Sequence, residues 1–273
     1  MLLSLDSGVS ALEQFQQQLN VIANNIANVN TVGFKSADVN FADTLSQTLG
    51  SNAAGSMQVG TGVMMSSITN DFSAGTLTST GNQSNMAISG NGFFLVKDPT
   101  SGNSYVTRDG SFTLDNGYLV TSNGMRVQGY SDSGLSTVGD IKIDNNGNTA
   151  EMLRYTIGDD GTISVLLAGT PSTPSTTITR GQILLDNVAN PNQLLKVGNN
   201  LYSGLTAAGA STTPVAPKTS GMGSIATSSL EMSNVDLAQQ LTSLISVQSA
   251  YQANSKVITT SDNVLQTLVN LVR

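Results

Sequence analysis

The chain has 273 residues, which is enough for one or two domains with a substantial core. It contains no cysteine and no histidine, which excludes a disulfide framework, metal sites built on thiolate or imidazole, and Ser-His-Asp or Cys-His catalysis. A formal charge of -7 argues against nucleic acid as a partner, because phosphate neutralisation needs clustered Lys and Arg.

Only 11% of the residues are charged, so Ser, Thr, Asn and Gly must cover much of the surface. Such a surface suits packing against further copies of the chain, because few charges need to be desolvated. An exported β protein rich in Ser and Thr is the alternative reading of the same composition.

Apolar residues recur every seven positions at the N-terminus. Two neighbouring columns are formed, the first by Leu5, Leu12, Leu19 and Ile26, and the second by Phe15, Ile22 and Val29. This pattern predicts an amphipathic helix that begins between Ser4 and Ser10, with Ser10 and Glu13 as a capping pair. Gly33 accepts the positive φ that is common just past a helix end, so the helix is expected to stop before it.

The stretch 35–70 carries a weaker pattern. Phe41, Leu45 and Leu49 could form one or two further amphipathic helical turns, but we expect a mostly extended connector over 35–70. Gly60-Thr61-Gly62 does not continue as a dinucleotide-binding fingerprint, because Met65 stands where the third glycine belongs.

From Asp71 onward the apolar period changes to two, which is typical of strands. Short apolar runs occur at 86–88, 93–96, 112–114, 119–120, 153–157, 163–167, 183–185 and 194–195. Five Asn-Gly or Asp-Gly pairs lie between these apolar runs, and such pairs accept the positive φ of tight hairpin turns. They are Asp109-Gly110, Asn116-Gly117, Asn123-Gly124, Asn146-Gly147 and Asp160-Gly161. The sequence therefore predicts an antiparallel all-β domain over 71–232, which includes a return segment of small residues at 207–223.

One loop resembles the start of a calcium-binding loop, with oxygen-bearing side chains at Asp144, Asn146 and Asn148. Thr149 stands where glycine is required and Tyr155 where the bidentate glutamate should be, so a turn is the better interpretation.

Asp109 and Asp115 could pair as the acid and base of a glycosidase. Each lies beside a turn glycine, where Asp is favoured for backbone reasons, and Phe93-Phe94 reads as core packing. We therefore expect no catalytic residue, no metal site and no cofactor.

The C-terminus carries a longer apolar column than the N-terminus. Its members are Leu237, Leu244, Tyr251, Ile258, Leu265 and Val272, widened by Leu241, Val247, Leu268 and Val269. A helix is expected from about Ser233, with Asp236 as its capping partner, and it would be roughly 54 Å long from Leu237 to Val272. Because this length exceeds the diameter of a small domain, the apolar column needs partners beyond its own domain.

The two terminal helices are expected to pair as a coiled coil, which orders fully only when several of its faces are covered. A two-helix hairpin that lies on a core is the alternative.

These readings give an α+β chain. The expected domains are 1–34 with 233–273 as a helical coiled-coil domain, 35–70 as the connector and 71–232 as the β-rich outer domain. No stretch approaches the eighteen consecutive apolar residues of a membrane span, and the start of the chain lacks the basic and apolar regions of a secretory signal.

Several blocks in order along the chain resemble the bacterial flagellar rod and hook proteins. The N-terminal block is 22–35, with the signature residues Ala23, Asn24, Asn25, Asn28, Gly33, Phe34 and Lys35. Similar blocks lie at 71–77, 88–94, 107–112, 198–202, 233–237 and 250–256.

The resemblance implies a structural axial protein and not an enzyme. It implies a tubular homo-oligomer in which paired terminal helices line an export channel beneath an outer β domain. It also implies passage through the flagellar type III export apparatus, and contacts with rod, hook cap and hook-filament junction proteins. No membrane insertion and no nucleic acid partner are implied.

Within the family, Phe41-Ala42-Asp43, the run 76–81 and Val235-Asp236-Leu237 are more similar to the hook protein, which would be extracellular. Hook proteins commonly carry a further outer domain, for which 131–159 leaves no room, so a distal rod protein in the periplasm is the alternative. A secreted β-domain enzyme or glycan-binding module is the rival from another class. Limited proteolysis distinguishes them, because a monomeric filament subunit should lose both ends and keep about 71–229.

Overall fold

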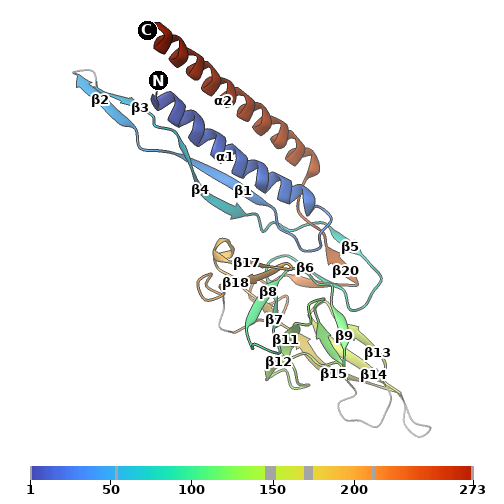
Figure 1. Cartoon of the computed structure of the whole chain (residues 1–273). Coiled ribbons are helices and arrows are strands. Elements are labelled where there is room, and N and C mark those ends of the chain that lie inside the picture. The colour runs from blue at the N-terminus through green and yellow to red at the C-terminus, as the bar shows by residue number, and fades with distance from the viewer. Residues whose placement is uncertain (1, 53–54, 145–151, 169–174, 211–212, 272–273) are drawn as a thin grey trace. The chain divides into compact units, whose positions relative to one another are not determined.

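The computed structural model describes residues 2–52, 55–144, 152–168, 175–210 and 213–271. The chain divides into two compact units. Unit 1 consists of Met1–Val29, Lys35–Asp71 and Val235–Arg273, and unit 2 of Asn30–Phe34 and Phe72–Asn234. Two terminal helices and a β-rich body between them confirm the predicted α+β class (Figure 1).

The helices of unit 1 are α1, Leu2–Ala27, and α2, Leu237–Leu271. The start of α2 is capped by Asp236, whose Oδ1 accepts the backbone N–H of Ala238 at 2.8 Å and of Gln239 at 3.3 Å. Asp236 itself, and not Ser233, is therefore the N-cap. Neither helix is long and apolar enough to cross a membrane, over the residues that the structure describes.

The predicted capping pair Ser10 and Glu13 was wrong. α1 begins at Leu2, so Ser10 lies inside the helix, where its hydroxyl donates to the carbonyl oxygen of Ser7 at 3.0 Å. A serine in the third turn of the helix offered a plausible start only because the apolar column upstream of it is short.

α1 and α2 contact each other in unit 1, and α1 also contacts the strands that follow it (Figure 1). β1, Ala37–Asp43, pairs antiparallel with β4, Val63–Asn70, and β2, Gln47–Asn52, pairs with β3, Gly55–Val59. The contacts show that the helices are partners, while a coiled-coil geometry stays a prediction.

The possible helical turns at Phe41, Leu45 and Leu49 were wrong, because Phe41 lies in β1 and Leu49 in β2. Exposed and half-buried residues nearly alternate along β1, and the ring of Phe41 packs edge-on against Phe15 of α1, with 6.4 Å between ring centroids. Packing of one strand face on α1 thus decides the conformation of a segment whose own apolar spacing also fits a helix.

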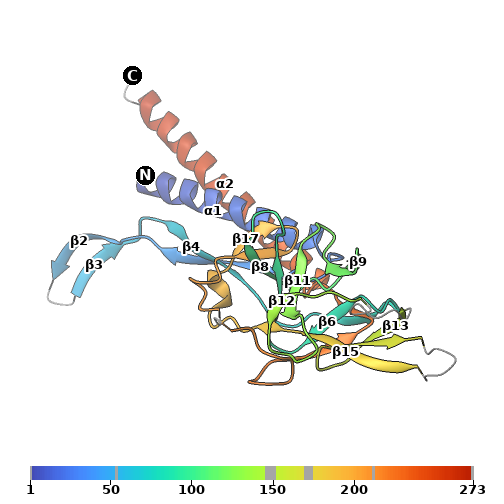
Figure 2. The same cartoon turned by 90° about the horizontal axis from the view of Figure 1, so that it is seen from below.

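Unit 2 is built on one large antiparallel sheet, whose strands follow the order β13-β14-β15-β11-β7-β8-β18-β17 (Figures 1 and 2). β10 and β12 also pair with β11, β9 with β10, and β16 with β7. Two smaller ribbons, β6 with β19 and β5 with β20, complete the described part of the unit. The strand bounds are Leu77–Ser79 (β5), Met86–Ser89 (β6), Phe93–Lys97 (β7), Ser104–Thr107 (β8), Thr113–Asp115 (β9), Tyr118–Val120 (β10), Arg126–Tyr130 (β11), Val138–Asp140 (β12), Met152–Ile157 (β13), Thr162–Leu167 (β14), Thr176–Ile183 (β15), Leu185–Asp186 (β16), Leu195–Gly198 (β17), Leu201–Ser203 (β18), Ser224–Thr227 (β19) and Ser229–Glu231 (β20), and a 3-10 helix covers Pro191–Gln193.

Three of the five predicted turn pairs join hairpin strands. Asn116-Gly117 joins β9 to β10, Asn123-Gly124 joins β10 to β11, and Asp160-Gly161 joins β13 to β14. The prediction of a hairpin turn at Asp109-Gly110 was wrong. The carbonyl oxygen of Gly110 accepts the N–H of Met86 at 3.0 Å, and the next residue, Ser111, forms a bridge with Asn85. Asn146-Gly147 lies outside the described residues.

The core of unit 2 lies against the large sheet. Phe94 and Phe112 are buried and meet edge-to-face at 5.1 Å between centroids, among the buried aliphatic side chains of β6, β11 and β14. A second cluster joins Phe93, Val106 and Tyr202 to Phe72. Core packing of Phe93-Phe94 is thus confirmed.

Candidate assembly site

The predicted N-terminal assembly residues are all at least partly covered within unit 1. Ile22 is buried, Leu5, Leu12, Phe15, Leu19 and Ile26 are half-buried on α1, and Val29 is half-buried just after α1 ends. A Cβ atom at Gly8 would lie 3.2 Å from Cγ1 of Ile258 on α2, and one at Gly62 would overlap the side chain of Ser10. α1 therefore has two partners in its own unit, α2 and the ribbon of β1 and β4.

The predicted C-terminal assembly residues do not lie on one seam. Val247 is buried, and Leu244, Ile258 and Leu265 are half-buried on the face of α2 that carries it. The others, Leu237, Leu241, Tyr251 and Leu268, are exposed in the single chain, and Val272 lies outside the described residues. The heptad column thus mixes residues that contact α1 with residues that α1 leaves open.

Seven exposed apolar residues of α2 form two stripes, and Tyr251 and Val269 are exposed outside these stripes. The first stripe is Leu237, Leu241 and Ile245, at four-residue spacing, and Ile245 is 63% exposed. The second stripe is Val257, Val264, Leu268 and Leu271, at spacings of seven, four and three, and Leu271 is 75% exposed. At 100° per residue the two stripes are about 150° apart around the helix. α2 therefore has three apolar faces, of which α1 covers one.

Sequence reasoning missed Ile245, Val257, Val264 and Leu271 because they do not fall in the heptad column. Their signal was present as a second repeat, since 257, 264, 268 and 271 match the seven-residue spacing of a helical seam in a different register.

The signature residues between 22 and 35 divide between two tasks. On α1, Ala23 and Asn24 are exposed while Asn25 is buried, and the Nδ2 of Asn28 donates to Oδ1 of Asn24 at 2.8 Å. Lys35 belongs to unit 1, and its side chain is fully buried. Gly33 and Phe34 belong to unit 2.

The segment Asn30–Phe34 docks on unit 2 through its backbone. The N–H of Gly33 donates to the carbonyl oxygen of Glu231 at 2.8 Å, and Nδ2 of Asn200 donates to the carbonyl oxygen of Val32 at 2.7 Å. The ammonium of Lys196 lies 4.9 Å above the centre of the Phe34 ring. The end of the signature is thus fixed by contacts inside unit 2, and we call these contacts of Asn30–Phe34 the joint.

A buried ion pair stabilises this joint from inside unit 2. Nη1 of Arg108 lies 3.4 Å from Oε2 of Glu231, and the two side chains are 4% and 0% exposed. Oε1 of Glu231 also accepts the N–H of Gly75 at 2.9 Å, and the guanidinium of Arg108 stacks over Phe93 at 5.0 Å. Burial lowers the pKa of Arg108, and the carboxylate of Glu231 opposes that shift. One carboxylate therefore ties together three stretches of chain that are distant in sequence.

Gly33→Ala is expected to destabilise unit 2 by at least about 2 kcal/mol. Gly33 has a φ of +67°, and a Cβ there would lie 2.6 Å from the backbone nitrogen of Asp109. Gly81→Ala is the matched control, because its φ is +70° but no atom lies within 4 Å of the added Cβ. Urea unfolding should show a larger loss of unfolding free energy for Gly33→Ala than for Gly81→Ala. Equal losses would mean that the close approach of Gly33 to the backbone of Asp109 does not affect stability.

The stability of unit 2 is expected to fall as the pH rises from about 10 to about 12. Tyr202 is 2% exposed, and burial raises the pKa of its phenol to about 12. Between the unfolded and folded pKa values only the unfolded state loses this proton, so rising pH favours unfolding by about 2–3 kcal/mol in total. Tyr202→Phe should remove that slope in urea titrations, and parallel pH profiles for the two chains would contradict the assignment.

The candidate catalytic and metal residues serve local structure. Oδ1 of Asp109 accepts the N–H and the hydroxyl of Ser111, at 2.9 and 2.7 Å, and Asp115 is exposed at the start of a hairpin turn. Asp144 forms ion pairs with Lys142 and Arg180, and Tyr155 lies in β13, while residues 145–151 of the possible calcium loop lie outside the described residues. Asp115 thus lies at a hairpin turn, as predicted, whereas Asp109 holds Ser111 locally without a hairpin.

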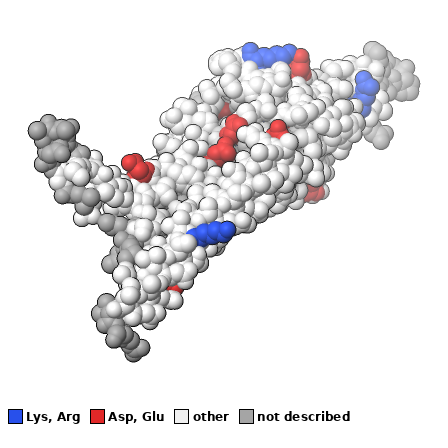
Figure 3. Space-filling view, turned by 90° about the horizontal axis from the view of Figure 1, so that it is seen from above, with Lys and Arg blue, Asp and Glu red and all other residues white. Residues whose placement is uncertain are grey.

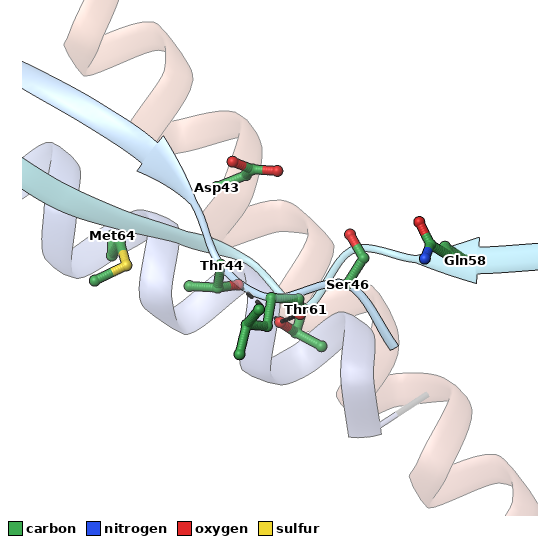
Figure 4. A pocket seen from close by; sticks show the side chains of 7 residues that line it. Asp43, Thr44, Ser46, Gln58, Thr61 and Met64 are labelled. Atoms are coloured by element: carbon green, nitrogen blue, oxygen red, sulfur yellow. Dashed lines mark hydrogen bonds between the residues drawn. The ribbon is translucent and has the colours of Figure 1, made fainter. Parts of the chain in front are cut away.

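An open hollow lies where the two ribbons of unit 1 meet (Figure 4). The hydroxyls of Thr44 and Thr61 are 2.7 Å apart in it, and Thr61 donates to the carbonyl oxygen of Leu45 at 2.6 Å. Asp43 is the one charged residue among those that line it. The residues that the structure describes contain no group of three acidic side chains close enough to hold a metal ion.

Charged side chains are sparse on the face drawn in Figure 3, where they form isolated spots on a mainly uncharged surface. This matches a chain in which residues 44–70 and 206–216 carry no charge at all. Such a surface costs little to desolvate when another protein covers it.

Three family descriptions match this chain in order. "Flagella basal body rod protein" matches residues 5–35, "Flagellar hook protein FlgE/F/G D1 domain" matches 87–165, and "Flagellar basal body rod FlgEFG protein C-terminal" matches 226–271. The first and last cover the helical ends, and the middle one covers most of the large sheet.

Full-length relatives carry the same description. The chain is 42% identical to the flagellar basal-body rod protein FlgG of Bacillus subtilis over 100% of both chains. It is 37% identical to FlgG of Caulobacter vibrioides over 96% of this chain and 97% of that one. Similarity to the flagellar hook protein FlgE of Borreliella burgdorferi is 40% identity, over 58% of this chain and 37% of that one.

Proposed function

Because the chain belongs to the family of bacterial flagellar rod and hook proteins, which are structural components of the flagellum, we propose that it is a distal rod subunit that polymerises into a tube. The observation that carries this proposal is the end-to-end similarity to FlgG proteins, which includes both helical ends and the β-rich body. The rod places the protein in the periplasmic part of the basal body.

The hook, which the sequence blocks favoured, is less well supported than the rod. The hook relative shares only 37% of its own length with this chain, whereas the Bacillus subtilis rod relative shares all of it. The missing outer domain between 131 and 159 points the same way. The short blocks that look hook-like lie at 41–43, 76–81 and 235–237 and sample too little of the chain to outweigh a full-length match.

The proposed mechanism is non-catalytic and rests on α2. α1 covers one face of α2, and further copies of the chain would cover the first and second stripes. In each such contact, one surface of a subunit would meet a different surface of its neighbour. Such head-to-tail contacts do not close on themselves, so they generate an open helical tube. The pairing of α1 with α2 as a coiled coil, and export of subunits through the type III apparatus, belong to the same proposal.

Assembly of the purified chain, viewed by electron microscopy, tests the choice between rod and hook. A rod subunit is expected to form straight, rigid tubes. Curved tubes with a range of bends would support the hook instead, and a chain that stays monomeric at high concentration would overturn both. Labelled subunits in cells should lie within the cell envelope and not in the extracellular hook.

A further inference from the structure

Buried amide groups join α1, β1 and α2 within unit 1. Nδ2 of Asn25 donates to the carbonyl oxygen of Ala37 at 2.9 Å and to Oε1 of Gln240 at 3.3 Å. The N–H of Ala37 donates back to Oδ1 of Asn25 at 3.1 Å. Asn25 is 1% and Gln240 9% exposed, so water does not replace these partners. The side chain of Asn25 thus pairs with Ala37 as a neighbouring strand would, and it holds α2 at the same time.

The other contacts between the helices do not define one alignment. Gly8 against Ile258, and the buried or half-buried residues Val247 and Leu265, are apolar or small, and apolar helix faces tolerate a slip by one turn. A polar pair is different, because a buried amide that loses its partner is costly.

A one-turn slip of α2 would remove the acceptor for Asn25. In one direction it brings Leu244 to the place of Gln240, and leucine accepts no hydrogen bond. In the other direction it brings Asp236, whose Oδ1 accepts the N–H groups of Ala238 and Gln239 at the exposed helix start, so this slip would bury a negative charge in place of a neutral amide. The observed alignment pairs the buried amides without burying a charge.

We propose that Asn25 and Gln240 are a register lock, which sets the alignment of α2 on α1 and ties the first residue of β1 to that alignment. A single buried asparagine plays this part in coiled coils, where it fixes register at a cost in stability. The lock also fixes where the two open stripes of α2 lie relative to α1, which a repeating lattice requires. That last step rests on the proposed function, whereas the lock itself does not.

Cysteine cross-linking measures the alignment directly, since the chain has no cysteine of its own. Gly8→Cys with Ile258→Cys reports the observed register, because a Cβ at Gly8 would lie 3.2 Å from Ile258 Cγ1, which is close to disulfide range. Gly8→Cys with Asn254→Cys reports the one-turn slip that brings Asp236 to the place of Gln240, and Gly8→Cys with Asp262→Cys reports the slip that brings Leu244 there. In the parent chain the first pair should oxidise within one chain at least about tenfold faster than either slip pair, a ratio equivalent to about 1.4 kcal/mol.

The double variant Asn25→Leu and Gln240→Leu should keep the helical signal in far-ultraviolet circular dichroism. The ratio of the cross-linking rates of the observed-register pair and the slip pairs should fall close to one. Gln240→Met is the milder variant, which removes the acceptor but leaves Asn25 paired with Ala37, and it should lower the ratio by a smaller factor. Asn24→Leu, at an exposed neighbouring position, is the control and should keep the parent ratio.

An unchanged ratio in both lock variants would overturn the proposal, and so would a parent chain in which the first pair does not cross-link. A parent chain that cross-links as expected but never forms tubes would instead contradict the proposed function alone.

Discussion

Val264→Glu is expected to block polymerisation while the single chain folds normally. Val264 is 49% exposed in the single chain and lies in the middle of the second stripe, where the proposed lattice places another copy. A carboxylate there would be buried without a partner, which typically costs about 2–5 kcal/mol in an interface and raises the critical concentration at least about 30-fold. Sedimentation of assembled material over a concentration series measures the change.

Asn263→Glu is the matched control, because it adds the same charge one residue away on a different face of α2. We expect it to change the critical concentration by less than about threefold, as exposed single charges have small effects. If Val264→Glu assembles as readily as Asn263→Glu, the second stripe is not an interface between copies.

Glu231→Ala is expected to destabilise unit 2 by about 3–5 kcal/mol, the usual cost of removing one partner of a buried ion pair. The substitution leaves the guanidinium of Arg108 buried without its carboxylate and removes the acceptor for the N–H of Gly75. The free energy of unfolding in urea, followed by tyrosine fluorescence, measures the loss.

Two further variants separate the causes. Glu231→Gln keeps an acceptor for the N–H of Gly75 and removes only the charge. Its free energy of unfolding should therefore fall by less than that of Glu231→Ala. Lys142→Met breaks the pair between Lys142 and Asp144, whose side chains are 43% and 28% exposed, and should cost about 1 kcal/mol or less. A loss of that size for Glu231→Ala would show that the buried pair does not hold the joint.

The sequence predicts the elements of this chain better than their contacts. Heptad repeats marked both terminal helices, and period-two runs with Asn-Gly and Asp-Gly turns marked the sheet of unit 2, because both signals are local. The segment 35–70 was ambiguous, since Phe41, Leu45 and Leu49 fit a helix as well as a strand. Its packing on α1, through Phe15 and Phe41, resolves that ambiguity, and no local pattern records it.

Partners far apart in the chain could not be predicted. Arg108 and Glu231 lie 123 positions apart, and Asn25 and Gln240 lie 215 apart, so their residue types alone do not reveal the pairs. The same limit explains the assembly residues of α2. The heptad column of α2 mixes residues that contact α1 with exposed ones, and most of the second stripe lies outside that column in a different register.

Electron cryo-microscopy of tubes assembled from the purified chain tests the central claim most directly. We expect α2 to be a continuous helix whose first stripe (Leu237, Leu241 and Ile245) and second stripe (Val257, Val264, Leu268 and Leu271) each lie against other copies. A map in which both stripes face solvent or the central channel would contradict it.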